Sequence, residues 1–234
     1  MSDREQLSQK VIEQLNKSYE KIPFEGIPTV NNISNNEQFI KKQLCAFCID
    51  MRKSSNLMIE HGQLISGRVH KAFLTIVSDI VLRNGGRIRS FQGDSLLAFW
   101  KEENNQINLA LKSAMEIKKC LVVDFAEIFS RFGEINFGIG LDVGSVYILR
   151  IGETYQADNN DLIFIGQSVN FAVAIANHTK GPFHIRVSNE FYDRLNNNWK
   201  YDENNVSFWK TGIIPWNRKK HSVMMTQHII SFQE

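Results

Sequence analysis

The spacing of apolar residues along this chain predicts alternating strands and helices. An unbroken apolar run from Leu44 to Ile49 is typical of a strand that is buried on both faces. Apolar residues then recur every three or four positions up to about Leu82, which predicts a helix that ends at Asn84-Gly85-Gly86. Residues 87–100 follow as two short strands joined at Gly93-Asp94, because glycine readily adopts the positive φ of a tight turn.

A second helix and further strands are predicted after this hairpin. An amphipathic pattern predicts a helix over residues 107–121, and a strand from Ile135 to Asp142 comes next. We expect this strand to turn at Val143-Gly144 into another strand, residues 145–149. The glycines of this stretch do not predict a dinucleotide-binding loop, because a strand follows them and not a helix. Glycines within strands more often indicate close backbone packing or a bulge.

The same pattern predicts elements towards both ends of the chain. Residues 5–21 have the apolar spacing of a short amphipathic helix, and residues 22–37, rich in proline and asparagine, are typical of a connector. The polar residues 153–160 predict an exposed loop. The other predicted elements are a strand at 162–165, a helix of small residues at 166–177, a strand at 183–187, a short helix from Ser188 to Leu195, and strands around 206–214 and 222–230. An α+β fold is therefore expected.

Composition narrows the class of protein. A chain of 234 residues can bury a proper core, and its net charge of +2 gives no broad nucleic-acid-binding surface. The N-terminus has no apolar signal segment, and no apolar run approaches the length of a membrane span. Cys45, Cys48 and Cys120 lie among apolar neighbours, as expected of reduced thiols in a core. We therefore expect a soluble cytoplasmic protein.

Two carboxylates are predicted at strand ends, where they could hold a metal ion. Asp50 directly follows the buried strand, and Asp94 lies at the tip of the hairpin. Taken alone, Asp50 could equally cap the next helix, and Asp94 could be an ordinary turn residue. Residues 51–55 supply amides and hydroxyls at a predicted helix start, which favours anions. Asn170, near the start of a later helix, is on its own most simply a helix-start residue.

Four motifs in order resemble the class III nucleotidyl cyclase catalytic domain. They are Phe47-Cys48-Ile49-Asp50-Met51, Gln92-Gly93-Asp94 with Leu97-Ala98-Phe99, Gly138-Ile139-Gly140-Leu141-Asp142-Val143-Gly144-Ser145-Val146, and Gly166-Gln167-Ser168-Val169-Asn170-Phe171-Ala172. The resemblance covers about residues 40–195. It implies a ferredoxin-like βαββαβ core with additional C-terminal strands and a short N-terminal helix. Residues 1–38 would then form the helix and connector, and residues 39–234 the catalytic domain.

The resemblance implies a reaction that uses two metal ions. A cyclase joins the 3′ oxygen of a nucleoside triphosphate to its α-phosphorus and releases pyrophosphate, and two divalent cations, Mn²⁺ or Mg²⁺, stabilise the charges involved. Asp50 and Asp94 match the two metal-binding aspartates of the family, and the backbone carbonyl of Met51 is a further candidate ligand. Carboxylate and carbonyl oxygens are the donors that these cations prefer.

The resemblance also implies which residues bind the triphosphate and which subunits form a site. Arg52, Lys53, Ser54 and Ser55 at the helix start would bind phosphates, and Arg52 is in addition a candidate catalytic cation. Active sites of this family form between two head-to-tail domains. One domain supplies the metal carboxylates and the other the helix with the asparagine, which is Asn170 here. A chain with a single such domain therefore implies a homodimer.

One departure concerns the cation that stabilises charge on the phosphate. The family usually has an arginine four residues after the asparagine, and this chain has Ala174 there. Losing such a cation could raise the barrier by several kcal/mol. Either the domain is impaired, or Arg52, Arg150 or Lys210 replaces the missing arginine.

A second departure concerns the base. Adenylyl and guanylyl cyclases carry purine-reading side chains at the positions that are Ser90 and Ile163 here, and neither pair is present. Phe91 and Ile163 could line a smaller pocket for a pyrimidine. The chain is thus similar to the bacterial pyrimidine cyclases of the Pycsar antiphage systems, which make cyclic UMP or cyclic CMP to switch on a separate effector.

Three alternatives stay open. The first is an adenylyl cyclase with altered base contacts. The second is an inactive cyclase-like module that binds a nucleotide, which Ala174 favours and the two retained carboxylates disfavour. The third uses a ferredoxin-like core for another purpose, as polymerase palms and diguanylate cyclases do. The motif from Gly166 to Ala172 favours the class III cyclases over this last possibility.

Overall fold

A computed structural model describes residues 2–33, 37–103, 105–152 and 160–229 of the chain. These residues form two compact units. The smaller unit comprises residues 1–42 and 147–165, and the larger comprises residues 43–146 and 166–234. Most of the predicted loop at 153–160 lies outside the described residues.

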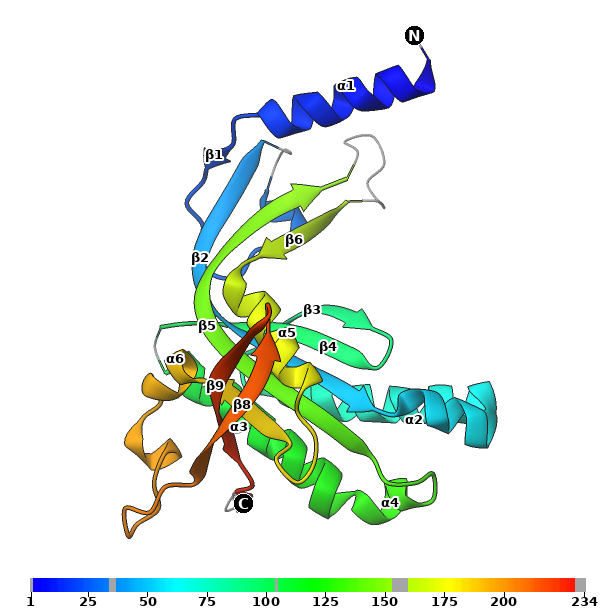
Figure 1. The fold of residues 1–234 in the computed structure, drawn as a ribbon, viewed down its shortest axis with the longest axis vertical. Coiled ribbons are helices and arrows are strands. Elements are labelled where there is room, and N and C mark those ends of the chain that lie inside the picture. The colour runs from blue at the N-terminus through cyan, green and yellow to red at the C-terminus, as the bar shows by residue number, and fades with distance from the viewer. Residues whose placement is uncertain (1, 34–36, 104, 153–159, 230–234) are drawn as a thin grey trace. The chain divides into compact units, whose positions relative to one another are not determined.

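The larger unit is built on a mixed β-sheet (Figure 1). In their order across the sheet the strands are β3 (Arg87–Gln92), β4 (Ser95–Lys101), β2 (Gln38–Arg52), β5 (Asn136–Ile151), β7 (Ile185–Ser188), β9 (Lys219–Thr226) and β8 (Trp209–Trp216). Neighbours pair antiparallel in β3–β4, β4–β2, β7–β9 and β9–β8, whereas β5 and β7 are parallel. The order β5-β2-β4-β3, with helices after β2 and β4, confirms the predicted ferredoxin-like βαββαβ core.

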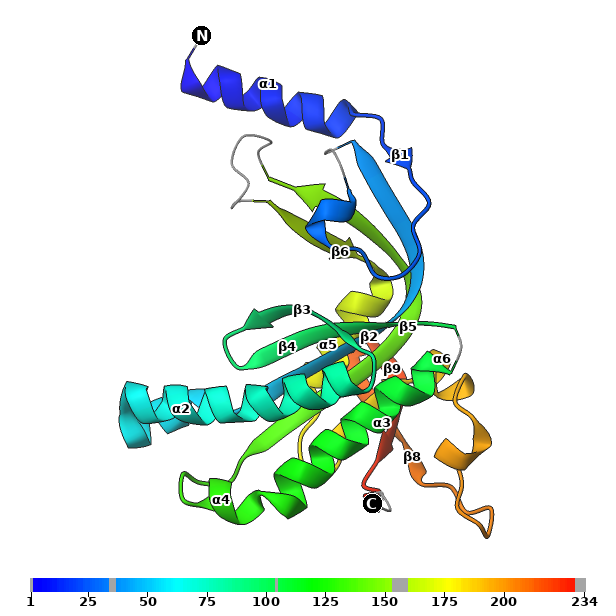
Figure 2. The same cartoon turned by 180° about the vertical axis from the view of Figure 1, so that it is seen from behind.

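Helices cover both faces of this sheet. Helices α2 (Ser54–Arg83) and α3 (Gln106–Lys119) lie side by side on one face (Figure 2). Phe73 of α2, Leu111 of α3 and Phe137 of β5 are fully buried in one core cluster between them and the strands. Helix α5 (Gln167–Asn177) packs on the opposite face, against β5, β7 and β8.

Glycines on β5 allow α5 to approach this closely. A Cβ atom on Gly138 would lie 2.9 Å from Nη2 of Arg52 and closer still to the backbone carbonyls of Ala176, in the last turn of α5, and of Thr179, just past its end. A Cβ on Gly140 would lie 2.9 Å from the Cβ of Ile175 and would overlap the backbone of α5. The expectation that these glycines indicate close backbone packing is confirmed.

The predicted turn at Val143-Gly144 is wrong. Strand β5 continues without a break from Asn136 to Ile151. Glycine occurs at alternate positions of this strand, so its glycines share one face. A Cβ on Gly144 would lie 3.2 Å from the Cβ of Ser168, so this glycine serves the same packing as Gly138 and Gly140 and not a turn.

Other elements differ from expectation mainly at their ends. Strand β2 begins at Gln38, before the apolar run that starts at Leu44, and α2 is interrupted at Gly62, which has a φ of 79°. Strands β8 and β9 correspond to the two predicted C-terminal strands, but they begin and end at different residues. Their turn is at Asn217-Arg218, where both φ values are positive, as a two-residue hairpin turn requires. The remaining helices of this unit are the π-helical turn Cys120–Asp124, α4 (Ala126–Ser130), α6 (Asn189–Asp193) and the 3-10 turn Asn197–Trp199.

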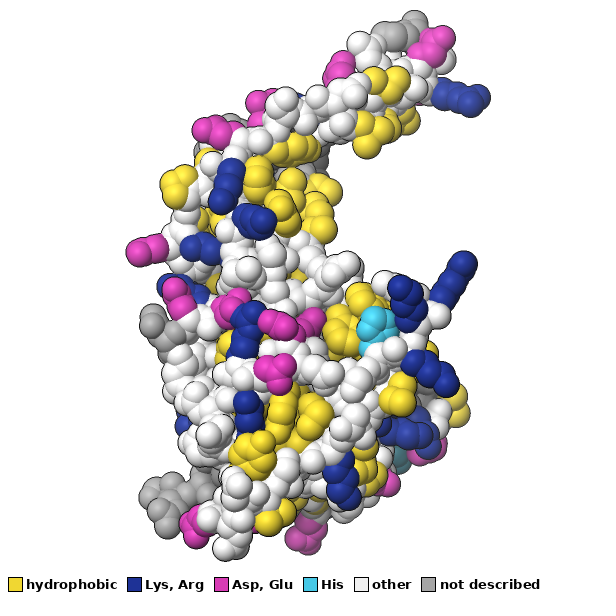
Figure 3. All heavy atoms as spheres, turned by 60° about the vertical axis from the view of Figure 1, so that its left-hand side comes forward, with side chains coloured by type: hydrophobic (Ala, Val, Ile, Leu, Met, Phe, Trp, Pro, Cys, Tyr) yellow, Lys and Arg dark blue, Asp and Glu magenta, His cyan; other side chains and the backbone are white. Residues whose placement is uncertain are grey.

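The smaller unit contains the predicted N-terminal helix. Helix α1 (Asp3–Asn16) begins with a capping box between Ser2 and Glu5, and none of its residues is buried. Its apolar side chains lie at the surface in Figure 3. The rest of this unit includes β1 (Glu20–Lys21), a 3-10 turn (Val30–Asn32) and β6 (Asp161–Ile165), with the adjoining parts of β2 and β5. Among the described residues, no helix is long and apolar enough to cross a membrane.

Candidate active site

The two candidate metal ligands come from adjacent strands of the larger unit. Asp50 lies near the end of β2, opposite Ser95 at the start of β4. Asp94 directly precedes Ser95 in the turn of the β3–β4 hairpin, where Gly93 has a φ of 62°. The antiparallel pairing of β2 and β4 therefore brings the two aspartates to the same sheet end.

The two carboxylates are close enough for the charge of one to act on the other. Burial raises the pKa of Asp50, and the negative charge of Asp94 raises it further. Arg52 opposes both effects by donating from Nη1 to Oδ2 of Asp50 at 2.5 Å. A pair of carboxylates in this situation is stabilised by any additional cation that binds between them.

The donor set of this pair fits magnesium or manganese. Among the described residues, no three histidine, cysteine, aspartate or glutamate side chains converge to form a metal site. Mg²⁺ in nucleotide-binding sites is often held by one or two protein carboxylates, with the remaining oxygens supplied by waters and substrate phosphates. Asp50 and Asp94 meet that requirement. The carbonyl of Met51, whose side chain is buried, belongs to the same strand end.

The start of α2 follows Asp50 almost immediately. Lys53 is the N-cap residue, and its side chain is exposed while its backbone has a φ of 58°. That left-handed conformation costs a non-glycine residue about 1–2 kcal/mol. Ser54 and Ser55 form the first turn, where helix amides lack intrahelical partners and attract anions. The predicted phosphate site thus includes a lysine, Lys53, whose backbone conformation is strained.

Arg52 has a different environment from these three residues. Besides Asp50, its guanidinium group donates to the backbone carbonyls of Thr179, at 3.0 Å from Nε, and of Ala176, from Nη2. These carbonyls lie at the C-terminal end of α5. The predicted contact between Arg52 and a phosphate stays a prediction. In the described structure the guanidinium group of Arg52 instead makes hydrogen bonds within the protein.

Asn170 is exposed on the first turns of α5. Its backbone amide donates to the carbonyl of Gly166 at 3.2 Å, and its side chain is on the helix face that points away from the sheet. Ala174 is one turn further along the same face. Gly166 is required at the helix start, because a Cβ there would lie 2.7 Å from the carbonyl oxygen of Ser145.

The residues proposed to replace the missing arginine lie in different places. Arg150 is on β5 in the smaller unit, where it donates to the carbonyl of Ile33 at 3.0 Å and to Oδ1 of Asn160 at 3.3 Å. Lys210 is exposed on β8 of the larger unit. Arg52 is held by the contacts described above, so Lys210 is the most accessible of the three.

The candidate base-pocket residues are divided between the two units. Ser90 and Phe91 lie on β3 of the larger unit, and the side chain of Phe91 is mostly exposed. Ile163 lies on β6 of the smaller unit, where it pairs with Leu149 and is partly exposed. Their assignment to the base stays a prediction.

Sequence reasoning missed a buried polar pair formed by residues of β5 and β7. Asp142 of β5 is buried and accepts hydrogen bonds from the hydroxyl of Ser188 at 2.5 Å and from the amide of Val143 at 2.8 Å. Burial raises the pKa of Asp142 to about 6. Ser188 also caps α6 by accepting from the amide of Phe191 at 3.0 Å, at the start of the predicted short helix. The lone aspartate in the glycine-rich motif was the only available signal.

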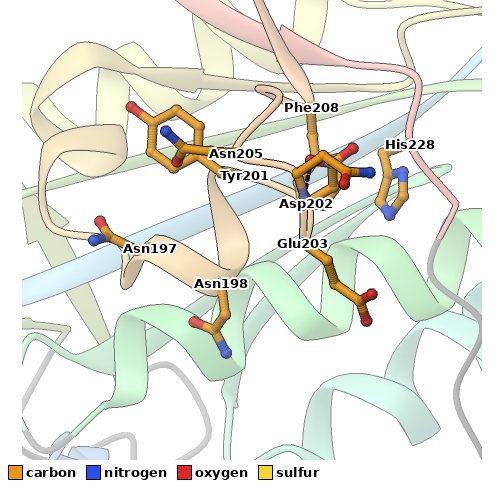
Figure 4. A pocket seen from close by; sticks show the side chains of 9 residues that line it. Asn197, Asn198, Tyr201, Asp202, Glu203, Asn205, Phe208 and His228 are labelled. Atoms are coloured by element: carbon orange, nitrogen blue, oxygen red, sulfur yellow. Dashed lines mark hydrogen bonds between the residues drawn. The ribbon is translucent and has the colours of Figure 1, made fainter.

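A separate cavity of about 630 Å³ opens elsewhere on the larger unit (Figure 4). It is lined by polar residues of the segment 197–205 together with Phe208 and His228, whose rings stack at 4.0 Å. None of the predicted site residues lines it, so it is distinct from the carboxylate pair.

Sequence comparison finds curated relatives across most of the chain. A protein named uridylate cyclase from Burkholderia cepacia is 24% identical over 190 residues, which cover 79% of this chain and 80% of the relative. Another uridylate cyclase, from a Rhodovulum species, is 24% identical over 203 residues, covering 84% and 83%. No protein-family profile matches the chain.

Solved structures share the fold at lower identity. An adenylyl cyclase from P. aeruginosa superimposes with a TM-score of 0.65 at 17% identity, covering 83% of this chain and 97% of that one. A guanylyl cyclase gives a TM-score of 0.65 at 17% identity, covering 80% and 91%. The chain has the class III nucleotidyl cyclase fold. The resemblance inferred from the four motifs is therefore confirmed, with relatives named uridylate cyclases and structural neighbours named adenylyl and guanylyl cyclases.

Proposed function

We propose that this chain is a nucleotidyl cyclase that converts a pyrimidine nucleoside triphosphate into its 3′,5′-cyclic monophosphate and pyrophosphate. The observation that carries the proposal is the Asp50 and Asp94 pair at adjacent strand ends of a class III cyclase fold. The curated relatives support UTP over CTP as the substrate, because the two relatives described above are named uridylate cyclases. Neither Ser90 nor Ile163 supplies a purine-reading group.

In the proposed reaction the 3′ hydroxyl loses its proton to solvent and its oxygen bonds to the α-phosphorus, while the bond from that phosphorus to pyrophosphate breaks. Two divalent cations, Mn²⁺ or Mg²⁺, would supply stabilisation of the attacking oxygen and of the triphosphate charge when bound. Asp50 and Asp94 would hold them. Lys53 and the amides of the α2 start would bind the phosphates, since an ammonium group and unpaired helix amides both favour anions.

We further propose that the active enzyme is a homodimer in the cytoplasm. Asn170 is exposed on the outer face of α5, where a second subunit's substrate could reach it. The free, buried Cys45 and Cys48 suit a reducing compartment. The cyclic nucleotide would act on a separate effector, as in the antiphage systems that the sequence resembles.

The test is to incubate the purified protein with each of the four ribonucleoside triphosphates and Mn²⁺ and to identify the products by mass spectrometry. We expect cyclic UMP or cyclic CMP to predominate, and no product from a matched Asp94→Ala protein. Predominant cyclic AMP would instead identify an adenylyl cyclase with altered base contacts.

A second candidate function follows from Ala174. A cyclase-like module that only binds a nucleotide would not need the cation that this position lacks. Metal-dependent binding of a triphosphate, measured by calorimetry, together with no product from any of the four substrates would favour that function.

A further inference from the structure

Arg52 connects two parts of the larger unit that are far apart in sequence. Its Nη1 atom donates to Oδ2 of Asp50 at 2.5 Å, and its Nε atom donates to the carbonyl of Thr179 at 3.0 Å. Its Nη2 atom donates to the carbonyl of Ala176. All three nitrogen atoms of this rigid, planar group therefore donate a hydrogen bond, each to a different residue.

The carbonyl partners of Arg52 belong to the end of α5. Helix α5 ends at Asn177, and its last carbonyl groups carry the negative end of the helix dipole. A cation in contact with these groups stabilises the helix end. The amide of Thr179 also donates to the carbonyl of Ala176 at 3.0 Å, and Oγ1 of Thr179 donates to the carbonyl of Ile175 at 2.7 Å. The segment that Arg52 contacts is thus itself ordered.

The sheet leaves space for this guanidinium group. Gly138 of β5 lies beneath it, and a Cβ at that position would be 2.9 Å from Nη2 of Arg52. The same Cβ would overlap the carbonyl groups of Ala176 and Thr179. The side chain of Arg52 is only about one-fifth exposed, as is that of Asp50. The contact is therefore a built part of the larger unit and not a surface ion pair.

We infer that Arg52 is a positioning residue that sets Asp50, the proposed metal ligand, and α5, the helix of Asn170, in a fixed relation within one subunit. The inference rests on the proposed function and assigns Arg52 a role other than direct contact with the triphosphate. Arg52 has its donors directed at Asp50 and at the end of α5, whereas Lys53, the next residue, has an exposed side chain at the helix start.

This role has a specific consequence in a head-to-tail dimer. There, Asp50 of one subunit and Asn170 of the other complete the same active site. Arg52 of each subunit would therefore act on both sites, through Asp50 at one and through α5 at the other. A residue that only contacted phosphate would act solely at the site to which its own Asp50 contributes.

A heterodimer experiment separates these possibilities. Two differently tagged chains, one with Asp94→Ala and the other with Asn170→Ala, are co-expressed and purified through both tags. One intact active site forms, with both carboxylates from the Asn170→Ala chain and Asn170 from the Asp94→Ala chain. Arg52→Met is then added to either chain, and the rate of cyclisation is measured with UTP and Mn²⁺. Arg68→Met, an exposed position of α2, is the matched control.

We expect Arg52→Met to lower the rate in either chain by about 10- to 100-fold, because small displacements of reacting groups have effects of that size. Arg52→Lys should restore part of the rate, since its compact ammonium group keeps the positive charge but lacks the planar fork that reaches three separate acceptors. Arg68→Met should change nothing. A loss confined to the Asn170→Ala chain would overturn the positioning role at α5. No loss in either chain would overturn the inference as a whole.

The proposed function can fail separately. An inactive heterodimer, when the wild-type protein is active, would contradict the head-to-tail arrangement, and an inactive wild-type protein would contradict the cyclase activity. In both cases amide hydrogen exchange still tests the link itself. Arg52→Met should speed exchange in residues 172–180 relative to Arg68→Met at equal global stability, and unchanged exchange there would contradict the link.

Discussion

Gly140 of β5 lies directly beneath Ile175 of α5, so closely that a Cβ on the glycine would be 2.9 Å from the Cβ of the isoleucine. The backbone of α5 would be closer still. The position of the helix that carries Asn170 is therefore set by the absence of a side chain on the strand below it. Even a methyl group at position 140 must displace the helix or the strand.

Gly140→Ala should lower the free energy of unfolding by about 1–3 kcal/mol, the usual cost of overpacking a close contact. Gly67→Ala is the matched control, because Gly67 is in α2 and a Cβ there has no neighbour within 4 Å. That variant should be stabilised by about 0.5–1 kcal/mol, since alanine is a better helix former. Urea unfolding of both proteins measures the difference, and equal effects of the two substitutions would contradict the packing of α5 described here.

Lys53→Gly should stabilise the protein by about 1 kcal/mol, because the φ of 58° at this position costs lysine but not glycine. The same change should lower the cyclisation rate if the lysine binds the triphosphate. Arg218→Gly is the control, since Arg218 has a φ of 62° in the β8–β9 turn. It should give the same rise in stability with full activity. Thermal unfolding and initial rates measure the two effects, and an unchanged rate for Lys53→Gly would exclude its phosphate contact.

Asp94→Ala should abolish activity and also the thermal stabilisation by Mn²⁺. The wild-type protein should gain about 2–3 kcal/mol at a metal concentration of 100 times the dissociation constant. Without metal, the variant should be as stable as the wild type or more so, because the charge that raises the pKa of Asp50 has been removed. Asp79→Ala, on the exposed face of α2, should leave both properties unchanged. A Mn²⁺ response in the Asp94→Ala protein would contradict the metal assignment.

Asp142 predicts a pH dependence of stability with a definite sign. Burial raises the pKa of this carboxyl from 3.8 to about 6, so the folded state holds the proton more tightly than the unfolded state. The stabilisation is complete below pH 3.8 and is lost as the pH rises through about 6. The difference corresponds to about 3 kcal/mol. The only charged neighbour that raises this pKa is Glu190, while the Ser188 and Val143 hydrogen bonds lower it.

Asp142→Asn keeps the shape and the acceptor oxygen but removes the titration. Relative to the wild type, it should therefore gain stability between pH 4 and pH 6, as measured by thermal unfolding across that range. Asp193→Asn, at the exposed end of α6, should leave the pH profile unchanged. Parallel profiles for wild type and Asp142→Asn would show that Asp142 does not titrate in this range.

Local patterns were sufficient to predict most elements of the fold. The apolar run from Leu44 to Ile49 does form a strand that is buried on both faces, and the helical spacing before Leu82 does form α2. The start of β2 was missed because the polar residues Lys41, Lys42 and Gln43 separate it from the apolar run that begins at Leu44. Within the smaller unit these residues make other kinds of contact. The Nζ atom of Lys41, for example, lies 5.1 Å from the centre of the Tyr147 ring. Such pairing leaves no periodic signal in the sequence.

The site was predictable only where a side chain carried the signal. The sequence correctly placed Asp50 at the end of a buried strand and Asp94 in a hairpin turn, because an apolar run and a Gly-Asp turn are local signals. The partners of Arg52 at the end of α5 are backbone carbonyls, more than 120 residues away in sequence. The prediction of a turn at Val143-Gly144 failed because its cause also lies far away in sequence. The residue that packs against Gly144 is Ser168, which belongs to α5.

The buried thiols of β2 have a practical consequence. Burial raises the pKa of Cys45 and raises that of Cys48 to about 12, whereas alkylating reagents attack the thiolate form. Both thiols should resist modification until the central strand separates from its neighbours. Cys120 is only partly buried, so a reagent should reach its thiol without opening of the sheet. The rate at which iodoacetamide labels the first two cysteines thus reports how often the sheet opens, with the third as an internal reference in the same molecule.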